Sequence, residues 1–175
     1  MTSTRLGALA GLCLTLLAAP ALLATQAPDP LVVFVVRHAD KLELDRDPGL
    51  SPAGVSRVAS LVATLRHSAI DQVHTTDFRR TRDTARPVAA ALGAELHLYA
   101  PSEPETLVER LRAAGGRHLV VGHSNTVPPL VSLLGGEPGS PIDEPGEYDR
   151  LYVVTVAGRS ATTVRLSYGD PYQPQ

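Results

Sequence analysis

Two runs of residues that are typical of buried strands each end at a histidine. Residues 31–36 are all aliphatic or aromatic, and Arg37 and His38 follow them directly. Residues 118–121 form a second, largely apolar run, which one glycine separates from His123. Short apolar runs of this kind are typical of the central strands of a parallel sheet. Because ligands of open α/β sheets bind beyond the carboxyl ends of the strands, we expect both histidines to face one crevice.

The chain after residue 30 alternates strand patterns with helix patterns, which is typical of an α/β fold. Ser51 is a good N-cap residue and Pro52 suits the first helical position, so a helix is predicted to begin there. The apolar face of this helix is predicted to comprise Val55, Val58, Leu61, Val62 and Leu65. We expect strands at 31–36, 70–74, 95–98 and 118–122, helices at 52–67, 79–92, 105–114 and 128–134, and a hairpin of strands at 150–156 and 161–167.

The first 27 residues have the pattern of a secretory signal peptide. Arg5 gives a positive start, residues 6–23 are mostly apolar, and small residues form candidate cleavage sites that end at Ala21 or Ala27. An uncleaved membrane anchor is the alternative, because the apolar stretch is close to the shortest length that spans a bilayer. We therefore expect a leader at 1–27, one domain at 28–175, and an exported protein, periplasmic or extracellular, that contacts the membrane only if the leader is retained.

Composition excludes several kinds of function. Cys13 is the only cysteine and lies in the predicted leader, so the mature chain can hold no disulfide and no cysteine-based metal site or nucleophile. The formal net charge is −2, tryptophan is absent, and no run of lysine or arginine occurs, so binding to nucleic acid is not expected. The sequence carries no signal of the oligomeric state.

The two histidines, and the arginine beside the first, favour phosphoryl chemistry. An imidazole can attack a phosphoryl group and hold it covalently, and His38 is the predicted nucleophile. Arg37 offers a fork of donors that matches phosphate oxygens. His123 is expected in the same crevice, and Ser124, at the start of the next helix, is a further candidate phosphate ligand. An ordinary polar strand end is the alternative interpretation of residues 37–38.

A third group of polar residues, 75–86, follows the second predicted strand. It contains arginines at positions 79, 80, 82 and 86. Such a run can form a solvated helix face, and we expect at least two of these arginines to be exposed. The remaining histidines, at positions 67, 74, 97 and 118, are assigned structural or surface roles.

Four segments carry motifs that belong together. They are residues 35–39 (Val-Val-Arg-His-Ala), 50–54 (Leu-Ser-Pro-Ala-Gly), 75–85 and 121–124 (Val-Gly-His-Ser). In this order they resemble the Arg-His-Gly signature, the Leu-Thr-x-x-Gly segment, the Ser-Ser-x-x-x-Arg-x-x-x-Thr-Ala stretch and the second histidine of the histidine phosphatase superfamily. That family includes phosphoglycerate mutases and phosphohistidine phosphatases, and this short chain is similar to the phosphohistidine-phosphatase-like branch. Ala39 replaces the usual glycine of the signature.

The resemblance implies a fold, a mechanism and a set of site residues. The fold is a single three-layer α/β/α domain with a mixed, mostly parallel sheet, as in phosphoglycerate mutases. The mechanism passes through a phosphohistidine intermediate at His38. Arg80 is implied as the second phosphate-binding arginine beside Arg37, and His123 as the second histidine of the site.

The general acid that would protonate the leaving oxygen has three candidates. In family members that have one, it commonly follows the third strand, where Glu103 and Glu105 lie. Glu105 fits the first turn of a helix, where a carboxylate is favourable for electrostatic reasons alone. Glu103 lies in a loop between prolines and is the preferred candidate. Asp40, which is close to the proposed nucleophile, is the third.

We therefore expect a phosphatase that hydrolyses a small phosphomonoester without a metal or another cofactor. One alternative is a catalytically inactive module of the same fold that binds an anion or a partner. A second is a metal-dependent hydrolase in which His38, Asp40 and His123 are ligands. A mutase is a weaker alternative, because it needs an enclosing lid and the connections after the strands are short. The substrate itself is not determined by the sequence.

Overall fold

The computed structural model describes residues 30–43, 46–144 and 146–174. The leader predicted at 1–27 lies outside these ranges, so its cleavage stays a prediction. No helix within the described ranges is long and apolar enough to cross a membrane.

Strands and helices alternate along the described chain, and all the strands join one mixed sheet. The elements are β1 (Leu31–Arg37), α1 (Pro52–Leu65), β2 (Gln72–Thr75), α2 (Arg79–Leu92), β3 (Glu95–Leu98), α3 (Pro104–Ala114), β4 (Arg117–Gly122), α4 (Val127–Leu133), β5 (Arg150–Ala157) and β6 (Ser160–Ser167). The strand order is β3-β2-β4-β1-β5-β6. The first four of these strands are parallel, and β5 and β6 are antiparallel to their neighbours. The predicted α/β class with a mostly parallel sheet is confirmed.

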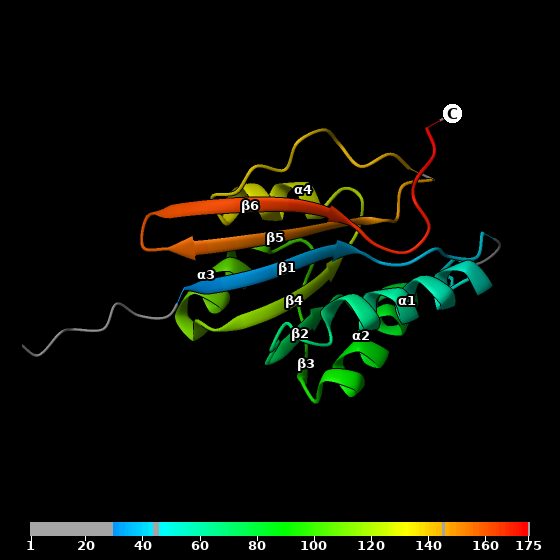
Figure 1. Ribbon diagram of the computed structural model, residues 1–175, viewed down its shortest axis with the longest axis horizontal. Coiled ribbons are helices and arrows are strands. Elements are labelled where there is room, and N and C mark those ends of the chain that lie inside the picture. The colour runs from blue at the N-terminus through cyan, green and yellow to red at the C-terminus, as the bar shows by residue number, and fades with distance from the viewer. Residues whose placement is uncertain (1–29, 44–45, 145, 175) are drawn as a thin grey trace, which may run out of the picture.

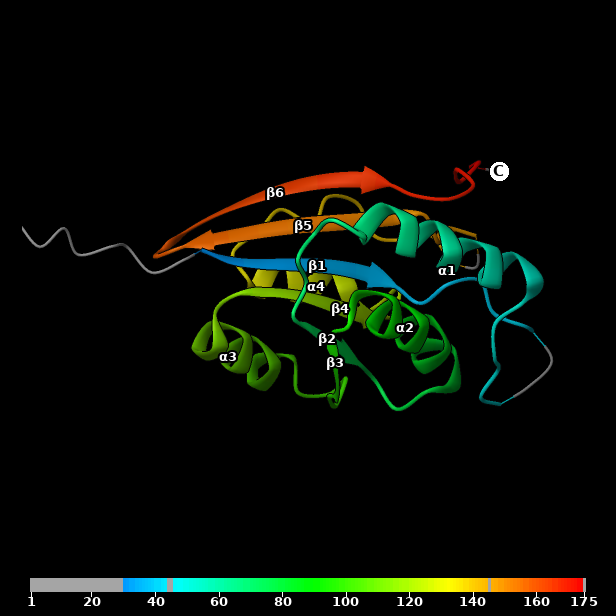
Figure 2. The ribbon, with the colours of Figure 1, turned by 60° about the horizontal axis from the view of Figure 1, so that its bottom comes forward.

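The sheet separates two helical layers (Figures 1 and 2). Helices α1 and α2 cover one face and α3 and α4 cover the other. Strand β1 is buried on both sides, since Val33 and Val35 pack in the core with α3 and α4, whereas Phe34 and Val36 pack in the core with α1 and α2. This double burial explains why its sequence is a continuous apolar run rather than an alternating one.

The start of α1 follows the predicted signals, but one residue of its predicted buried face is exposed. Ser51 caps α1, because its hydroxyl oxygen accepts from the backbone N–H of Gly54 over 3.1 Å. Val55 was predicted to be buried and is 61% exposed, so that prediction is wrong. The buried position of this first turn belongs to Gly54, where a Cβ would lie 2.1 Å from the carbonyl oxygen of Asp40. Gly54 lies against the backbone of Asp40, and the next residue of the helix, Val55, points toward solvent.

The register between β1 and β4 places the two histidines next to each other. Arg37 pairs with Gly122 in the parallel ladder, and the N–H of His38 donates to the carbonyl of Gly122 over 2.9 Å. His38 and His123 therefore leave the sheet from adjacent strands at the same edge. This edge is the carboxyl end of the parallel strands, where open α/β sheets bind ligands.

Candidate active site

His38 and His123 face one another across the end of the sheet. Their ring centroids are 5.5 Å apart, and the rings make an angle of 67°. Both rings line one cavity of about 430 Å³. Two central strands thus bring together residues that lie far apart in the sequence.

The hydrogen bonds of His38 define which ring nitrogen is free to attack. Nδ1 lies 2.8 Å from the carbonyl oxygen of Ala39, which can only accept, so Nδ1 carries the proton. Nε2 accepts from Nε of Arg80 over 3.2 Å and is therefore unprotonated. Burial lowers the pKa of His38 from 6.5 to about 3, because the charged ring loses its solvation. The neutral ring presents a lone pair at Nε2, as a nucleophile requires.

His123 has the opposite tautomer. Nδ1 lies 3.3 Å from Nη2 of Arg80, which can only donate, so the proton of the neutral ring is on Nε2. Nε2 lies 3.0 Å from the hydroxyl of Thr76 and donates to it. Burial, followed by the charges of Arg80 and Arg37, lowers the pKa of His123 from 6.5 to about 4.

Three threonines support His123. The hydroxyl of Thr76 is 2.9 Å from that of Thr81, whose own proton can go to the carbonyl of Phe78 over 2.8 Å. The chain of donors therefore runs from His123 through Thr76 and Thr81 to the backbone at the start of α2. On the other side, the backbone N–H of His123 donates to Thr126 Oγ1 over 2.9 Å. Thr126 thus binds the histidine and makes no side-chain cap for α4.

Arg80 is the arginine of α2 that enters the cavity. Its side chain is 17% exposed, whereas that of Arg79 is 60% exposed. The guanidinium lies over the ring of Phe78, at 4.6 Å from the ring centroid, and its Nη1 atom is 3.7 Å from Asp47. Arg79 makes an ion pair with Asp83 on the surface of the same helix. The arginine that the resemblance indicates is therefore the one that reaches the histidines.

Arg37 is buried beneath the loop between α4 and β5. It is 1% exposed, and its guanidinium lies 3.9 Å from the centroid of the Tyr148 ring. Nη1 donates to the carbonyls of Asp143 and Glu147, at 3.3 and 2.9 Å. Nη2 is 3.1 Å from Oε1 of Glu144, and Nε has no hydrogen-bond partner among the described residues. Arg37, a predicted phosphate ligand, is therefore not itself part of the cavity lining, and its contact with the cavity is through Glu144, which is a lining residue.

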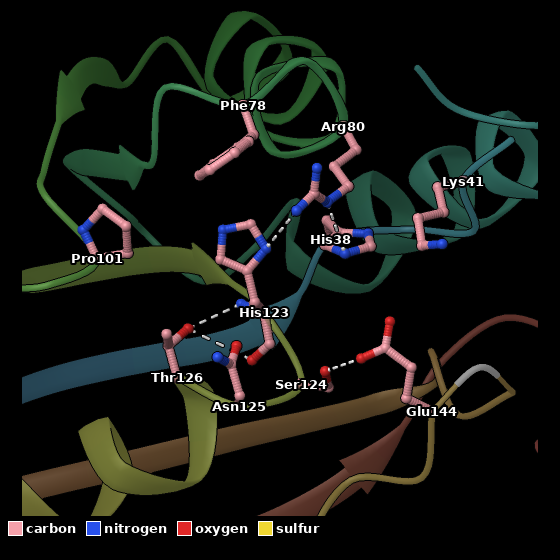
Figure 3. A pocket seen from close by; sticks show the side chains of 10 residues that line it. All are labelled: His38, Lys41, Phe78, Arg80, Pro101, His123, Ser124, Asn125, Thr126 and Glu144. Atoms are coloured by element: carbon pink, nitrogen blue, oxygen red, sulfur yellow. Dashed lines mark hydrogen bonds between the residues drawn. The ribbon is translucent and has the colours of Figure 1, made fainter. Parts of the chain in front are cut away.

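The cavity has an apolar side and a charged side, as Figure 3 shows. Phe78 and Pro101 lie on the apolar side, next to His123. Lys41 and Glu144 lie on the opposite side, beyond His38. The complete lining consists of His38, Lys41, Phe78, Arg80, Pro101, His123, Ser124, Asn125, Thr126 and Glu144.

None of the three carboxyls considered as the general acid lines this cavity. Asp40 is 2.6 Å from Nε of the buried Arg57, which binds it to α1. Glu103 is an exposed residue at the start of α3 and makes no side-chain cap, and Glu105 is exposed in the first turn. The carboxyl that does line the cavity is Glu144.

Sequence reasoning missed Glu144 because it lies in a loop rich in proline and glycine. Such a loop has no periodic pattern that would indicate which side chains point inward. Ser124, a predicted phosphate ligand, lines the cavity and donates a hydrogen bond to Oε2 of Glu144. Within the described ranges, no group of three or more histidine, cysteine or carboxylate side chains is arranged to hold a metal ion.

Comparisons with known proteins agree with this fold. Residues 33–100 match the family model of the histidine phosphatase superfamily (branch 1). The matched stretch contains Arg37, His38 and Arg80, and His123 lies beyond it. The resemblance to this superfamily that the sequence motifs indicated is confirmed. A comparison with curated protein sequences finds no significant match.

Several solved structures share the fold at low sequence identity. The protein histidine phosphatase SixA complexed with tungstate has a TM-score of 0.63 and 20% identity, covering 78% of this chain and 96% of that chain. The alpha-ribazole phosphatase from Shigella flexneri has a TM-score of 0.63 and 14% identity, with coverages of 78% and 96%. Phosphoserine phosphatase from Entamoeba histolytica has a TM-score of 0.56 and 14% identity, with coverages of 80% and 97%.

Proposed function

We propose that this chain is a phosphatase that hydrolyses a small phosphomonoester through a phosphohistidine intermediate at His38. The observation that carries this proposal is the position of Arg80, which donates to the unprotonated nitrogens of both His38 and His123. A guanidinium between two imidazoles can hold a phosphoryl group in front of the lone pair that attacks it. The match to the histidine phosphatase superfamily supports the same activity.

In the first step, Nε2 of His38 attacks the phosphorus and the bond to the leaving oxygen breaks. The Nδ1–H bond to the carbonyl of Ala39 holds the ring in position and stabilises the positive charge that the phosphorylated ring acquires. In the second step, water attacks the phosphorus, and the electron pair of the P–N bond returns to Nε2. His38 is then neutral again, with its proton still on Nδ1.

Cationic and polar groups around His38 stabilise the charge on the phosphoryl oxygens. Arg80 can turn its donors from the histidines to these oxygens as the phosphoryl group enters. Arg37 contributes its positive charge from beneath and Ser124 a hydroxyl donor from the side of α4, whereas the neutral His123 positions Arg80 by accepting from its guanidinium. These groups already lie beside the histidines before substrate arrives, so the turn of the Arg80 donors accompanies binding and little reorganisation is needed in the reaction itself.

Trapping the intermediate tests this proposal. The protein is mixed with a phosphomonoester labelled in its phosphate, quenched in alkali, in which phosphohistidine survives, and digested to locate the label. We expect one label on His38, none in the His38→Asn variant, and normal labelling in a His67→Asn control, since His67 is exposed in the turn that follows α1. Turnover without any label on His38 would contradict the proposed mechanism.

Metal independence is part of the proposal and needs its own assay. We expect a chelator-treated protein to keep its activity, because the site supplies its cations as guanidinium groups. Loss of activity with chelator and recovery with a divalent ion would favour a metal-dependent hydrolase. Binding of phosphate without turnover of any phosphomonoester would favour an inactive anion-binding module.

We also propose that residues 1–27 export the protein. Their positive start, apolar stretch and small residues support this assignment. N-terminal sequencing of protein from the extracytoplasmic fraction should begin after Ala21 or Ala27. An intact Met1 on soluble cytoplasmic protein would contradict it, and an intact leader in the membrane fraction would show an anchor.

A further inference from the structure

The carboxylate of Glu144 lies against two of the predicted phosphate ligands. Oε1 is 3.1 Å from Nη2 of Arg37, and Oε2 accepts a hydrogen bond from the hydroxyl of Ser124. The side chain is 49% exposed, and Figure 3 shows its carboxylate directed toward the space in front of His38. Glu144 is therefore in contact with groups that would surround a bound phosphoryl group, and it remains accessible to solvent.

Glu144 is the one carboxyl that lines this cavity among the described residues. The nearest competitor is Asp47, whose two oxygens accept from the backbone N–H of Arg79, at 2.9 and 3.1 Å. Asp47 is thus bound to the start of α2 and does not line the cavity. Asp40 is held differently, since its carboxylate accepts from the side-chain Nε of Arg57 over 2.6 Å.

The segment around Glu144 is held on both sides. The carbonyls of Asp143 and Glu147 accept from Arg37, and the backbone N–H of Asp143 donates to Oε2 of Glu147 over 2.9 Å. The hydroxyl of Tyr172, near the C-terminus, donates to the carboxylate of Asp143. These contacts fix the position from which Glu144 reaches the cavity, as expected for a group that has to meet a reacting atom.

We propose that Glu144 protonates the leaving oxygen and then accepts a proton from the water that hydrolyses the phosphohistidine. This inference rests on the proposed function and assigns the role for which the sequence favoured Glu103. In the first step, the P–O bond breaks as the P–Nε2 bond forms, and the carboxyl proton of Glu144 passes to the leaving oxygen. In the second step, the carboxylate removes a proton from the attacking water while the P–N bond breaks, which restores both groups.

The proton that this cycle needs is taken up from solvent when the substrate binds. In the free site Glu144 is ionised, because the hydrogen bond from Ser124 and the charge of Arg37 lower its pKa. A phosphoryl dianion adds negative charge beside the carboxylate and competes for the same donors, so the pKa of Glu144 rises in the complex. The substrate therefore binds together with one proton from solvent.

This role selects a class of substrate. A leaving alkoxide needs a proton in the transition state, whereas an activated aryl oxide or an imidazole can leave with much less assistance. A carboxyl at this position is thus useful for alkyl phosphomonoesters and of little use for phosphohistidine. We therefore assign alkyl phosphomonoesters as the substrate class.

The dependence of the rate on the leaving group tests the assignment. Single-turnover phosphorylation of His38 is measured with p-nitrophenyl phosphate, phenyl phosphate and glycerol phosphate, in the wild type and in Glu144→Gln, Glu103→Gln and Glu137→Gln. Glu137 is the matched control, since it is exposed in the same loop and does not line the cavity. All the variants lose one carboxylate.

We expect Glu144→Gln to slow phosphorylation by glycerol phosphate by about 10²-fold or more and by p-nitrophenyl phosphate only slightly. The same variant should accumulate phosphohistidine with p-nitrophenyl phosphate, because the base of the second step is missing. Equal losses with all three esters, no loss, or a selective loss in Glu103→Gln would each overturn the assignment. A wild type that forms no phosphohistidine with any ester would instead show that the proposed function is wrong.

Discussion

The guanidinium of Arg80 donates a hydrogen bond to Nε2 of His38, the nitrogen that has to attack the phosphorus in the proposed reaction. In the free site, the lone pair of the nucleophile is therefore already engaged. A phosphoryl group offers the guanidinium stronger, charged acceptors than a neutral imidazole does. Arrival of the substrate thus releases the lone pair at the moment when it is needed, and it also fixes the phosphoryl group beside it.

His38→Asn should abolish turnover while the protein stays folded. Asparagine occupies less space than the ring and keeps a donor for the carbonyl of Ala39, so packing changes little, but no nucleophilic nitrogen remains. We expect less than about 1% of the wild-type kcat, because removal of the covalent route leaves only the binding groups. Steady-state kinetics and a thermal melt of the same sample check both statements. A variant with more than a few per cent of the activity would remove His38 from this role.

Arg80→Ala should raise KM and lower kcat together. Arg80 faces the phosphoryl group in the ground state and in the transition state, and loss of one preorganised donor group costs about 10²- to 10³-fold in kcat. Arg79→Ala is the matched control, because Arg79 is one residue away and pairs with Asp83 on the surface. If Arg79→Ala were impaired and Arg80→Ala were normal, the assignment of the arginines would be wrong by one residue.

Thr76→Val should lower kcat by about 5- to 10-fold, the effect of losing one neutral hydrogen bond. Thr76 accepts from Nε2 of His123 and keeps Nδ1 unprotonated toward Arg80. Without this acceptor the proton of His123 can move to Nδ1, where it repels Arg80. A change in the acidic limb of the kcat profile against pH would separate this effect from simple loss of packing. Thr64→Val, on the exposed face of α1, is the control and should have no effect.

The sequence predicts well those parts of the structure that depend on neighbouring residues or on a periodic pattern of apolar residues. The double burial of β1 requires an unbroken apolar run, and Ser51 marks the start of α1 by a hydrogen bond that spans three residues. Gly93 ends α2 with φ of 67°, in the left-handed region that glycine adopts readily. The two histidines were placed at one edge because the carboxyl ends of parallel strands meet there.

The parts that could not be predicted depend on contacts between distant segments. Asp40 lies close to the proposed nucleophile in sequence, but the buried Arg57 binds its carboxylate. Glu144 reaches the cavity because Arg37 binds the carbonyls on either side of it, and no local pattern encodes that contact. The sequence shows Thr76 only as part of the motif at residues 75–85, whereas its role depends on the hydrogen bond to the ring of His123.

A cluster of histidines on the face of the sheet that α3 covers predicts a loss of stability in acid. Nε2 of His74 lies 3.2 Å from Nδ1 of His118, and the ring of His74 stacks on that of His97 with centroids 5.4 Å apart. Burial, followed by the charges of His118, His97 and Arg110, lowers the pKa of His74 from 6.5 to about 3. Nδ1 of His74 is buried without a hydrogen-bond partner among the described residues, so nothing compensates a proton that binds there.

The unfolded chain therefore binds a proton at His74 before the folded chain does. The contribution of the neutral ring to stability is complete above pH 6.5 and is lost as the pH falls toward 3. His74→Gln keeps a donor for His118 but cannot titrate. Between pH 7 and pH 5, its free energy of unfolding should therefore fall by about 2 kcal/mol less than that of the wild type. Urea unfolding at both pH values measures this difference, and His67→Gln, at an exposed position, should behave as the wild type does. Parallel losses of stability in the wild type and in His74→Gln would show that protonation of other groups, such as His38 and His123, dominates acid unfolding.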